Sequence, residues 1–385
     1  MTMKKHITIL TTILLAAKLF GAPDVLNLAE KSINSFDTKL YQSLCKTQGN
    51  VNYSAISIYS LLYVLQKGAD GTTKEQINSV IELEPDLEAD LQLKDIITGT
   101  QNMTNSFWYK NTLKIQGDYN QFIRDYNFEL KSTDFYQTQK VRKEINDYIS
   151  QKTDKLIENF LQDVLPAATK LVLLNTLYFN QKWKNEFDEE ATRNQTFYKT
   201  KENKIQVPMM NKTSNMQYYQ DNNFQIVELA YKDERYSMIV ILPIDYEYDF
   251  SKLNPAELVQ QFNESKARQR IQLSFPKFDI TSRYDLIPVL EALGMHDAFN
   301  PETSNLSNIF TNSENLYVDA AIHQVRIQVN EKETKAAAVT MFGMKATSAM
   351  PQPTIPFTAD HPFVYVIRDN ETGIDLFTGI VREPK

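Results

Sequence analysis

The chain has 385 residues, of which 42% are apolar, and its 41 Lys and Arg against 48 Asp and Glu give a formal charge of −7. Ordinary apolar content with one cysteine excludes a disordered chain, a collagen-like repeat and a disulfide-stapled miniprotein. A chain of this length buries roughly three quarters of its unfolded surface, so the core needs no metal or disulfide. The negative charge disfavours non-specific binding to nucleic acid or to an anionic membrane, because both need a cationic face.

The first residues have the layout of a secretory signal peptide. Three basic residues at 4–6 precede the apolar run 7–17, and the small residues Gly21 and Ala22 follow. The run is too short to span a bilayer. We therefore expect a leader over residues 1–22 and a secreted, extracellular protein, with a buried N-terminal helix as the alternative.

A secreted protein can carry glycans and disulfide bonds, so the seven sequons and the single cysteine of this chain are relevant to the expected secretion. Cys45 has no partner for an internal bridge, and a lone thiol is more often a small core hydrophobe than a nucleophile. Only sequons on exposed loops can carry glycan, which would make the chain a glycoprotein. The Asn-x-Ser/Thr sequons begin at Asn52, Asn102, Asn194, Asn211, Asn263, Asn305 and Asn370.

After the leader no linker, repeat or low-complexity tract divides the chain, so residues 23–385 are predicted to form one domain. The first strong helical signal is Thr72 followed by Glu75, which has the form of a capping box, with apolar residues through Ile81 on one face. A second amphipathic helix is predicted on the surface over residues 144–160.

The second half of the chain combines one more helix with several strands. Asp285 is placed to cap a helix that Gly294 ends. Segment 325–329 alternates apolar and polar residues, so one face of that strand is wet. Short apolar runs rich in β-branched or aromatic residues are predicted to be strands buried on both faces, at 171–179, 238–242 and 363–367. These signals predict an α+β domain with large sheets.

The stretch 331–356 has three prolines and no clear element, and a segment of this length without structure is typical of a functional loop or of disorder. Read at period two, Thr334, Ala336, Ala338 and Thr340 form a row of small side chains, which would suit a strand that slides into a tight gap in a sheet. By composition alone, an Ala-rich helical start to a surface loop is an equally good interpretation.

Several motifs resemble those of the serpin family. Segment 329–340 is similar to the serpin hinge that precedes the reactive-centre loop, and segment 175–187 follows the serpin spacing Asn-x-x-Tyr-Phe-x-x-x-Trp-x-x-x-Phe. The resemblance covers nearly everything after about residue 25. Further matches in the family's order are Asp134, Phe135, Ile145, Asn146, Val207, Pro208, Met209, Met210, Ser237, Met238, Leu242, Pro243, Leu293, Gly294, Met295, Phe299, Ala359, Asp360, His361, Pro362, Phe363, Ile367, Arg368, Thr372, Gly373, Leu376, Phe377, Gly379 and Pro384.

The resemblance implies a serpin-like single domain with large mixed β-sheets surrounded by helices and an exposed reactive-centre loop near the C-terminus. It also implies a suicide-substrate inhibitor of serine proteases. The protease cleaves the loop, and the loop inserts as a new central strand of the main sheet while the acyl-enzyme is still attached. The intact protein must then be metastable, because strand pairing and burial remain unmade until the loop is cut. We expect a monomer that is not itself an enzyme.

In this resemblance every second hinge residue must enter the buried face of the sheet, where bulk or charge slows insertion. Glu333 departs from the glycine usual in inhibitory serpins, which predicts a slower inhibitor. Glu333 and Lys335 are two residues apart, so in a strand both lie on the face opposite to the buried one, and the charge of Glu333 stays off the buried face. The expected hinge residues are Glu331, Glu333, Thr334, Ala336, Ala337 and Ala338.

A second group of residues matches the positions where the serpin sheet opens. Asn175 interrupts an apolar run, so it needs buried hydrogen-bond partners. Trp183 matches the residue near the point of first loop insertion, although core packing is the simpler interpretation of an isolated Trp. The expected sheet-opening residues are Ser54, Ser57, Asn175, Trp183 and His323.

Counted forward from Glu331, the usual family spacing places the reactive bond between Thr347 and Ser348, which favours an elastase-like or chymotrypsin-like protease. Counted back from Phe357, it lands near Ala349 and Met350 instead. Lys345 is the only basic side chain between Met341 and Pro356. The bond from Lys345 to Ala346, cut by a trypsin-like enzyme with an acidic pocket, is therefore the alternative.

Other chemistry has little support. Four histidines and no Gly-x-Ser-x-Gly motif disfavour a hydrolase. No zinc-ligand spacing and no phosphate-binding Gly-rich loop is present, so we expect no metal and no cofactor. The competing function is a non-inhibitory serpin with a carrier, chaperone or storage role, and Glu333 is the feature that favours it.

Overall fold

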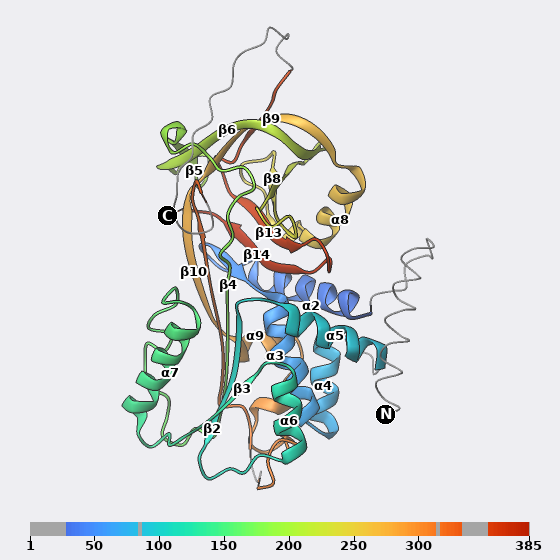
Figure 1. The fold of residues 1–385 in the computed structure, drawn as a ribbon, viewed down its shortest axis with the longest axis vertical. Coiled ribbons are helices and arrows are strands. Elements are labelled where there is room, and N and C mark those ends of the chain that lie inside the picture. The colour runs from blue at the N-terminus through green and yellow to red at the C-terminus, as the bar shows by residue number, and fades with distance from the viewer. Residues whose placement is uncertain (1–27, 84–86, 313–315, 333–352, 385) are drawn as a thin grey trace.

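The computed structural model describes residues 28–83, 87–312, 316–332 and 353–384, which form helices packed around two β-sheets (Figure 1). The leader predicted over residues 1–22 lies outside this part of the chain. No helix within the described ranges is long and apolar enough to cross a membrane. The helices are α2 (Leu28–Leu44), α3 (Ala55–Gly68), α4 (Gly71–Ile81), α5 (Leu87–Gly99), α6 (Gly117–Asp125), α7 (Thr138–Lys152), α8 (Pro255–Ser265) and α9 (Leu286–Ala292), with short 3-10 turns at Glu189–Ala191, Phe250–Lys252 and Asp297–Phe299.

A five-stranded sheet runs through the lower part of the molecule in Figure 1. Its two central strands pair in parallel, while each also has an antiparallel neighbour on its other side. In spatial order the strands are β10 (Phe278–Asp285), β11 (Ala320–Val329), β4 (Leu171–Tyr178), β2 (Met103–Lys110) and β3 (Glu129–Thr133).

A nine-stranded sheet forms the upper part, where α8 packs beside it (Figure 1). The long strand β6 pairs in turn with β5, β9 and β7, so this sheet curves around its own core. Its strands are β1 (Val51–Tyr53), β14 (Asp375–Val381), β13 (Phe363–Asp369), β8 (Tyr236–Pro243), β7 (Phe224–Ala230), β6 (Lys204–Gln220), β9 (Ala267–Pro276) and β12 (Ile355–Thr358), with β5 (Arg193–Tyr198) pairing to β6 off this path.

Strand β4 is buried on both faces, and its alternate residues belong to two different cores. Val172 and Leu174 pack in the cluster that α7 covers, whereas Leu171 and Leu173 belong to the main cluster that includes α3. Since side chains alternate along a strand, Asn175 faces the α3 side. The sequence therefore directs one polar side chain towards the N-terminus of α3.

The predicted α+β fold is confirmed, as are the fully buried strands over 171–179, 238–242 and 363–367. Segment 325–329 alternates buried and half-buried residues as expected. Asp285 caps α9 by accepting a hydrogen bond from Ile287 N at 3.2 Å. Gly294 follows that helix with φ of +106°, a value that favours glycine.

Two details of the helix predictions are wrong. Helix α4 begins at Gly71 with Asp70 as its N-cap, so Thr72 is not a capping residue. Its hydroxyl instead donates to Asp297 Oδ2 at 2.6 Å, because that side chain is brought close by the chain after α9. The helix predicted over 144–160 is α7, which ends at Lys152. The apolar residues beyond it pack in the same core from irregular backbone.

The contact between β13 and β14 depends on a glycine. Tyr365 lies opposite Gly379 in the register, and its hydroxyl donates to Asn52 Oδ1 at 2.8 Å. A Cβ at position 379 would lie 2.4 Å from the Tyr365 ring. The ring is fully buried, so it has no free space into which to move.

We expect Gly379→Ala to lower the free energy of unfolding by about 1–3 kcal/mol, because the added methyl overpacks this contact. Urea denaturation followed by circular dichroism measures the change. Gly99→Ala is the matched control, since a Cβ there meets no atom within 4 Å. Equal stability of the two variants would contradict the prediction.

Candidate functional site

The N-terminus of α3 lies beneath the five-stranded sheet and carries two of the predicted residues. Ser54 is the N-cap, with extended backbone, and its Oγ accepts a hydrogen bond from Ser57 N at 3.3 Å. A serine is among the preferred caps because its oxygen satisfies an orphan helical N–H. Both serines are fully buried. The cap therefore fixes Ser57 with its hydroxyl under strand β4.

Asn175 and His323 face each other across the two central strands. They are direct partners in the parallel register of β4 and β11, and His323 Nδ1 is hydrogen-bonded to Asn175 Oδ1. Ser57 Oγ donates to the same oxygen at 2.8 Å, while Asn175 Nδ2 donates to Ser57 O at 3.1 Å. One side-chain network thus spans both strands and the helix below them.

The hydrogen bonds of His323 require the neutral ring. Ser54 N donates to Nε2 at 3.2 Å, so that nitrogen must be the unprotonated one and Nδ1 carries the hydrogen. Burial lowers the pKa of His323 to about 3. Protonation at Nε2 would place two N–H donors against each other in a site without water-exposed surface, which costs several kcal/mol. The ring is therefore a fixed donor and acceptor at neutral pH.

Two members of this network were missed by the sequence reasoning. Asn105 on β2 accepts from Asn175 Nδ2, and its own Nδ2 donates to Ser60 Oγ at 3.1 Å. Ser60 Oγ in turn donates to Ser57 O at 2.8 Å. The available signal was a polar residue inside an otherwise strand-forming segment, as at Asn175. The network therefore ties three adjacent strands to α3.

Trp183 lies in a second cluster, eight residues beyond Asn175 on the same segment, where the ends of β4 and β11 meet. Its ring stacks on Tyr231 with centroids 4.5 Å apart and planes at 12°. Its Nε1 donates to Asn330 O at 2.8 Å, and its backbone N donates to Lys332 O at 3.2 Å. Trp183 therefore packs in the core and also contacts the chain that leads into the predicted hinge.

Glu331, the first of the predicted hinge residues, is held in the same cluster by an ion pair. Lys277 Nζ lies 2.8 Å from Glu331 Oε2, and Thr192 Oγ1 donates to Oε1 at 2.8 Å. Burial raises the pKa of Glu331, but the hydrogen bonds from Lys277 and Thr192 outweigh it and leave that pKa below its usual value. Lys277 and Thr192 carried no sequence signal, because the fold alone brings them to Glu331.

The structure thus brings Ser54, Ser57, Asn175 and His323 together and places Trp183 with Glu331 further along the same strand pair. The remaining hinge residues and both candidate reactive bonds lie outside the described residues: Glu333, Thr334, Ala336, Ala337, Ala338, Lys345, Ala346, Thr347 and Ser348. In the described part of the chain no group of three or more His, Cys, Asp or Glu side chains is arranged to hold a metal ion.

We expect His323 to make stability fall as the pH is lowered. Its folded pKa of about 3 lies below the ordinary value of 6.5, so between these values the unfolded chain binds a proton that the folded protein does not. The stabilisation from His323 is complete above pH 6.5 and falls by up to about 1.4 kcal/mol per pH unit below it. Urea unfolding of the wild type and of His323→Asn at several pH values between 7 and 5 measures the effect.

The quantity to compare at each pH is the difference in unfolding free energy between the wild type and His323→Asn. Burial raises the pKa of Asp37 to about 7, so that carboxyl titrates in the same window with the opposite sign, but it does so in both proteins. A difference in unfolding free energy that stays constant from pH 7 to 5 would contradict the prediction.

Lys277→Met removes the ammonium and leaves the Glu331 carboxylate buried with Thr192 as its remaining side-chain partner. We expect a loss of about 1–3 kcal/mol in the free energy of unfolding. Lys204→Met, an exposed lysine at the start of β6, is the control and should change it by less than about 0.5 kcal/mol. Adding Glu331→Gln to Lys277→Met should recover part of the loss, and no recovery would show that the ion pair is not the cause.

Comparisons with known proteins agree with this architecture. The family model for serpins, described as serine protease inhibitors, matches residues 31–384. Plasminogen activator inhibitor 1 of Sus scrofa is 31% identical over 379 residues, covering 93% of this chain and 93% of that protein. The structure of native protease nexin-1 with heparin superimposes with a TM-score of 0.83 at 27% identity, covering 94% of this chain and all of the other. Human thyroxine-binding globulin gives a TM-score of 0.83 at 25% identity, covering 93% and 100%. With its buried network between β4 and β11 and a family match over nearly its whole length, the chain belongs to the serpin family.

Proposed function

We propose that the protein is a secreted inhibitor of a serine protease that acts as a suicide substrate. The observation that carries the proposal is that β4 and β11 are direct neighbours while the chain leaves β11 straight into the hinge. The family description, serine protease inhibitor, supports the class of target. The target type, elastase-like or chymotrypsin-like with trypsin-like as the alternative, remains part of the proposal.

The topology leaves one position for a segment that folds back along β11. The other edge of β11 is already occupied by β10, which pairs with it along eight residues. A returning strand must therefore enter between β11 and β4, where it would run antiparallel to both. It would replace one parallel ladder with two antiparallel ones, and antiparallel pairing is slightly more stable per residue. This gain is withheld while the loop is intact.

Insertion has to break the network described above. A strand between β4 and β11 separates Asn175 from His323, so the bond between them is lost before the new ladders are complete. Before it reaches that pair, the strand must pass Trp183 and Glu331, which close the end of the gap where the chain leaves β11. These contacts set a barrier to insertion, and the intact state is long-lived because of that barrier.

The hinge sequence supports insertion of the loop, but one residue in it should slow that insertion. Thr334, Ala336 and Ala338 are small at every second position, as a strand entering a packed face requires. Glu333 replaces the glycine of typical inhibitory members. We therefore propose an inhibitor whose loop inserts slowly, so that more of the loop is hydrolysed by the protease before trapping.

Secretion is supported by the leader-like residues 1–22 and by the positions of the sequons. Asn194, Asn263 and Asn370 are exposed in the folded chain. Asn52 is fully buried and therefore is not an acceptor of glycan in the folded protein. We propose that the exposed sequons carry the glycan of the secreted protein.

A carrier role is the second candidate. Glu333 favours it, and one of the similar solved structures is named as a thyroxine-binding globulin. A carrier on this scaffold would be cleaved in its loop without trapping the protease.

The deciding experiment mixes the purified protein with elastase-like, chymotrypsin-like and trypsin-like proteases and separates the products on denaturing gels. A covalent band at the summed mass is expected, and mass spectrometry of the released peptide locates the cut bond. The nicked protein should also unfold at a markedly higher temperature than the intact protein. Clean cleavage without a covalent band or a rise in unfolding temperature would support the carrier role instead.

Two hinge variants test whether the hinge sets the rate of loop insertion. Glu333→Gly should raise the yield of covalent complex per cleaved molecule, because glycine eases the backbone turn. Thr334→Arg should lower it, because a long charged side chain would have to enter a buried face. Equal yields in both variants would rule out the hinge as the determinant of rate.

A further inference from the structure

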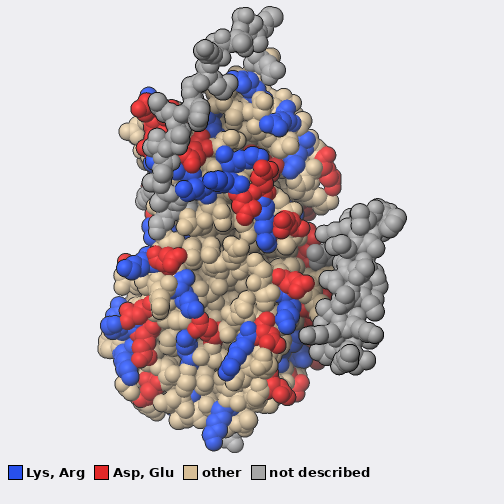
Figure 2. Space-filling view, in the orientation of Figure 1, with Lys and Arg blue, Asp and Glu red and all other residues tan. Residues whose placement is uncertain are grey.

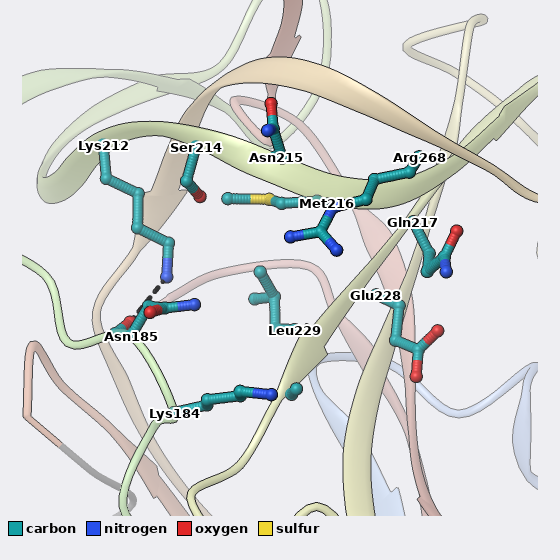
Figure 3. Close-up of a pocket in the computed structure, with 11 residues that line it drawn as sticks. Lys184, Asn185, Lys212, Ser214, Asn215, Met216, Gln217, Glu228, Leu229 and Arg268 are labelled. Carbon is teal, nitrogen blue, oxygen red and sulfur yellow. Dashed lines mark hydrogen bonds between the residues drawn. The ribbon is translucent and has the colours of Figure 1, made fainter.

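A polar pocket of about 190 Å³ lies between β6, β7, β9 and the segment that follows β4 (Figure 3). Its size leaves room for several molecules of water, each of which occupies about 30 Å³. Lys and Arg side chains gather on this upper part of the face shown in Figure 2, with acidic side chains beside them. The residues used below are Lys184, Lys212, Met216, Glu228, Leu229 and Arg268.

The charges that face the pocket are mostly positive. Lys212 on β6 and Arg268 on β9 point into it from one side, and Lys184 lies on the opposite wall (Figure 3). Lys184 is paired with Glu234 at 2.7 Å. The single acidic residue in the lining, Glu228, is paired with Lys266 at 2.9 Å.

Two of these cations have no acidic partner in the described part of the chain. Lys212 Nζ donates to Asn185 O at 2.9 Å and lies 3.8 Å from the centre of the Phe187 ring, neither of which carries a full negative charge. The backbone of Arg268 belongs to the ladder between β6 and β9, but within the described residues its side chain forms no hydrogen bond or ion pair. Desolvation lowers the pKa of Lys212 to about 7, as expected for an ammonium without a counter-ion.

We propose that this pocket binds a compact dianion, such as the phosphate group of a small phosphomonoester, between the Lys212 ammonium and the Arg268 guanidinium. Two uncompensated cations match a doubly charged group, and a guanidinium forms two parallel hydrogen bonds to phosphate oxygens. Leu229 and Met216 give the pocket an apolar side that suits a short organic substituent. A phosphomonoester should therefore bind more tightly than a bare inorganic dianion.

The pocket shares a wall with the Trp183 cluster. The carbonyl that Lys212 holds belongs to Asn185, two residues after Trp183 and two before Phe187, whose N donates to Glu331 O at 2.7 Å. A bound dianion would keep Lys212 protonated and in place, and so would brace this segment against the end of β11. The expected effect, slower loop insertion when the pocket is filled, rests on the proposed inhibitory function. The binding of the dianion itself is independent of that function.

Isothermal titration calorimetry of the intact full-length protein with sulfate and with glycerol 3-phosphate tests the binding. We expect both to bind, the ester more tightly, and Arg268→Gln to weaken each about tenfold or more, as for the loss of one charged hydrogen bond. Arg270→Gln makes the same charge change two residues along β9 outside the pocket and should have little effect. Equal losses in the two variants would overturn the proposal, because diffuse charge would then explain the binding.

The pH dependence identifies the second cation. Sulfate stays a dianion from pH 6 to 8, so its affinity should fall as the pH rises through the Lys212 pKa of about 7. Lys212→Met should bind sulfate weakly and without this pH dependence, while keeping the wild-type unfolding temperature within a few degrees. No sulfate or ester binding, or the same pH dependence in Lys212→Met, would refute the site.

A separate measurement addresses the link to insertion. If glycerol 3-phosphate binds, it should slow covalent complex formation in the wild type and leave the Lys212→Met rate unchanged. Binding without any effect on that rate would retain the site and reject the link, whereas absence of a covalent complex in every sample would count against the proposed function alone.

Discussion

The contact between β4 and β11 is the constraint on which the rest of the structure depends. The two strands are paired in parallel, β4 is buried on both faces, and the side chains of Asn175 and His323 bridge the two strands on one face of the sheet. A polar network in a region without water is strong while complete and costly once broken. Its surroundings therefore favour one arrangement of the sheet and resist partial separation. Helix α3 is part of this arrangement because its capping serine supplies the hydrogen bond that fixes the histidine ring.

Much of this could be predicted from the sequence because periodicity reports burial directly. The run 171–179 could only be a strand with both faces covered, and an asparagine inside it had to find partners. The capping-box prediction from Thr72 and Glu75 failed because a cap depends on where the preceding chain turns, which local sequence does not determine. Likewise α7 ends at Lys152 although apolar residues continue, because core packing does not require helical backbone.

The residues that contact each site residue could not be predicted from the sequence. Lys277 reaches Glu331 from the connection between β9 and β10, and Asn105 reaches Asn175 from the neighbouring strand β2. No local sequence pattern indicates either contact, because the paired residues are 54 and 70 positions apart in the chain. The pocket beside Trp183 is a similar case, because its cations come from β6 and β9 and from the segment after β4. Family resemblance supplied the predicted site residues, and the structure supplied the contacts of those that it describes.

The short strand β12 has a consequence for the whole loop. It pairs with β9 along four residues, so the chain that leaves β11 is attached again at Ile355. In the proposed inhibitory mechanism the loop is held at both ends until the protease cuts it, because β11 anchors one end and β12 the other. Cutting one peptide bond between these two anchors would give one half of the loop a free end. A single proteolytic cut would then decide, once and irreversibly, which molecules change shape.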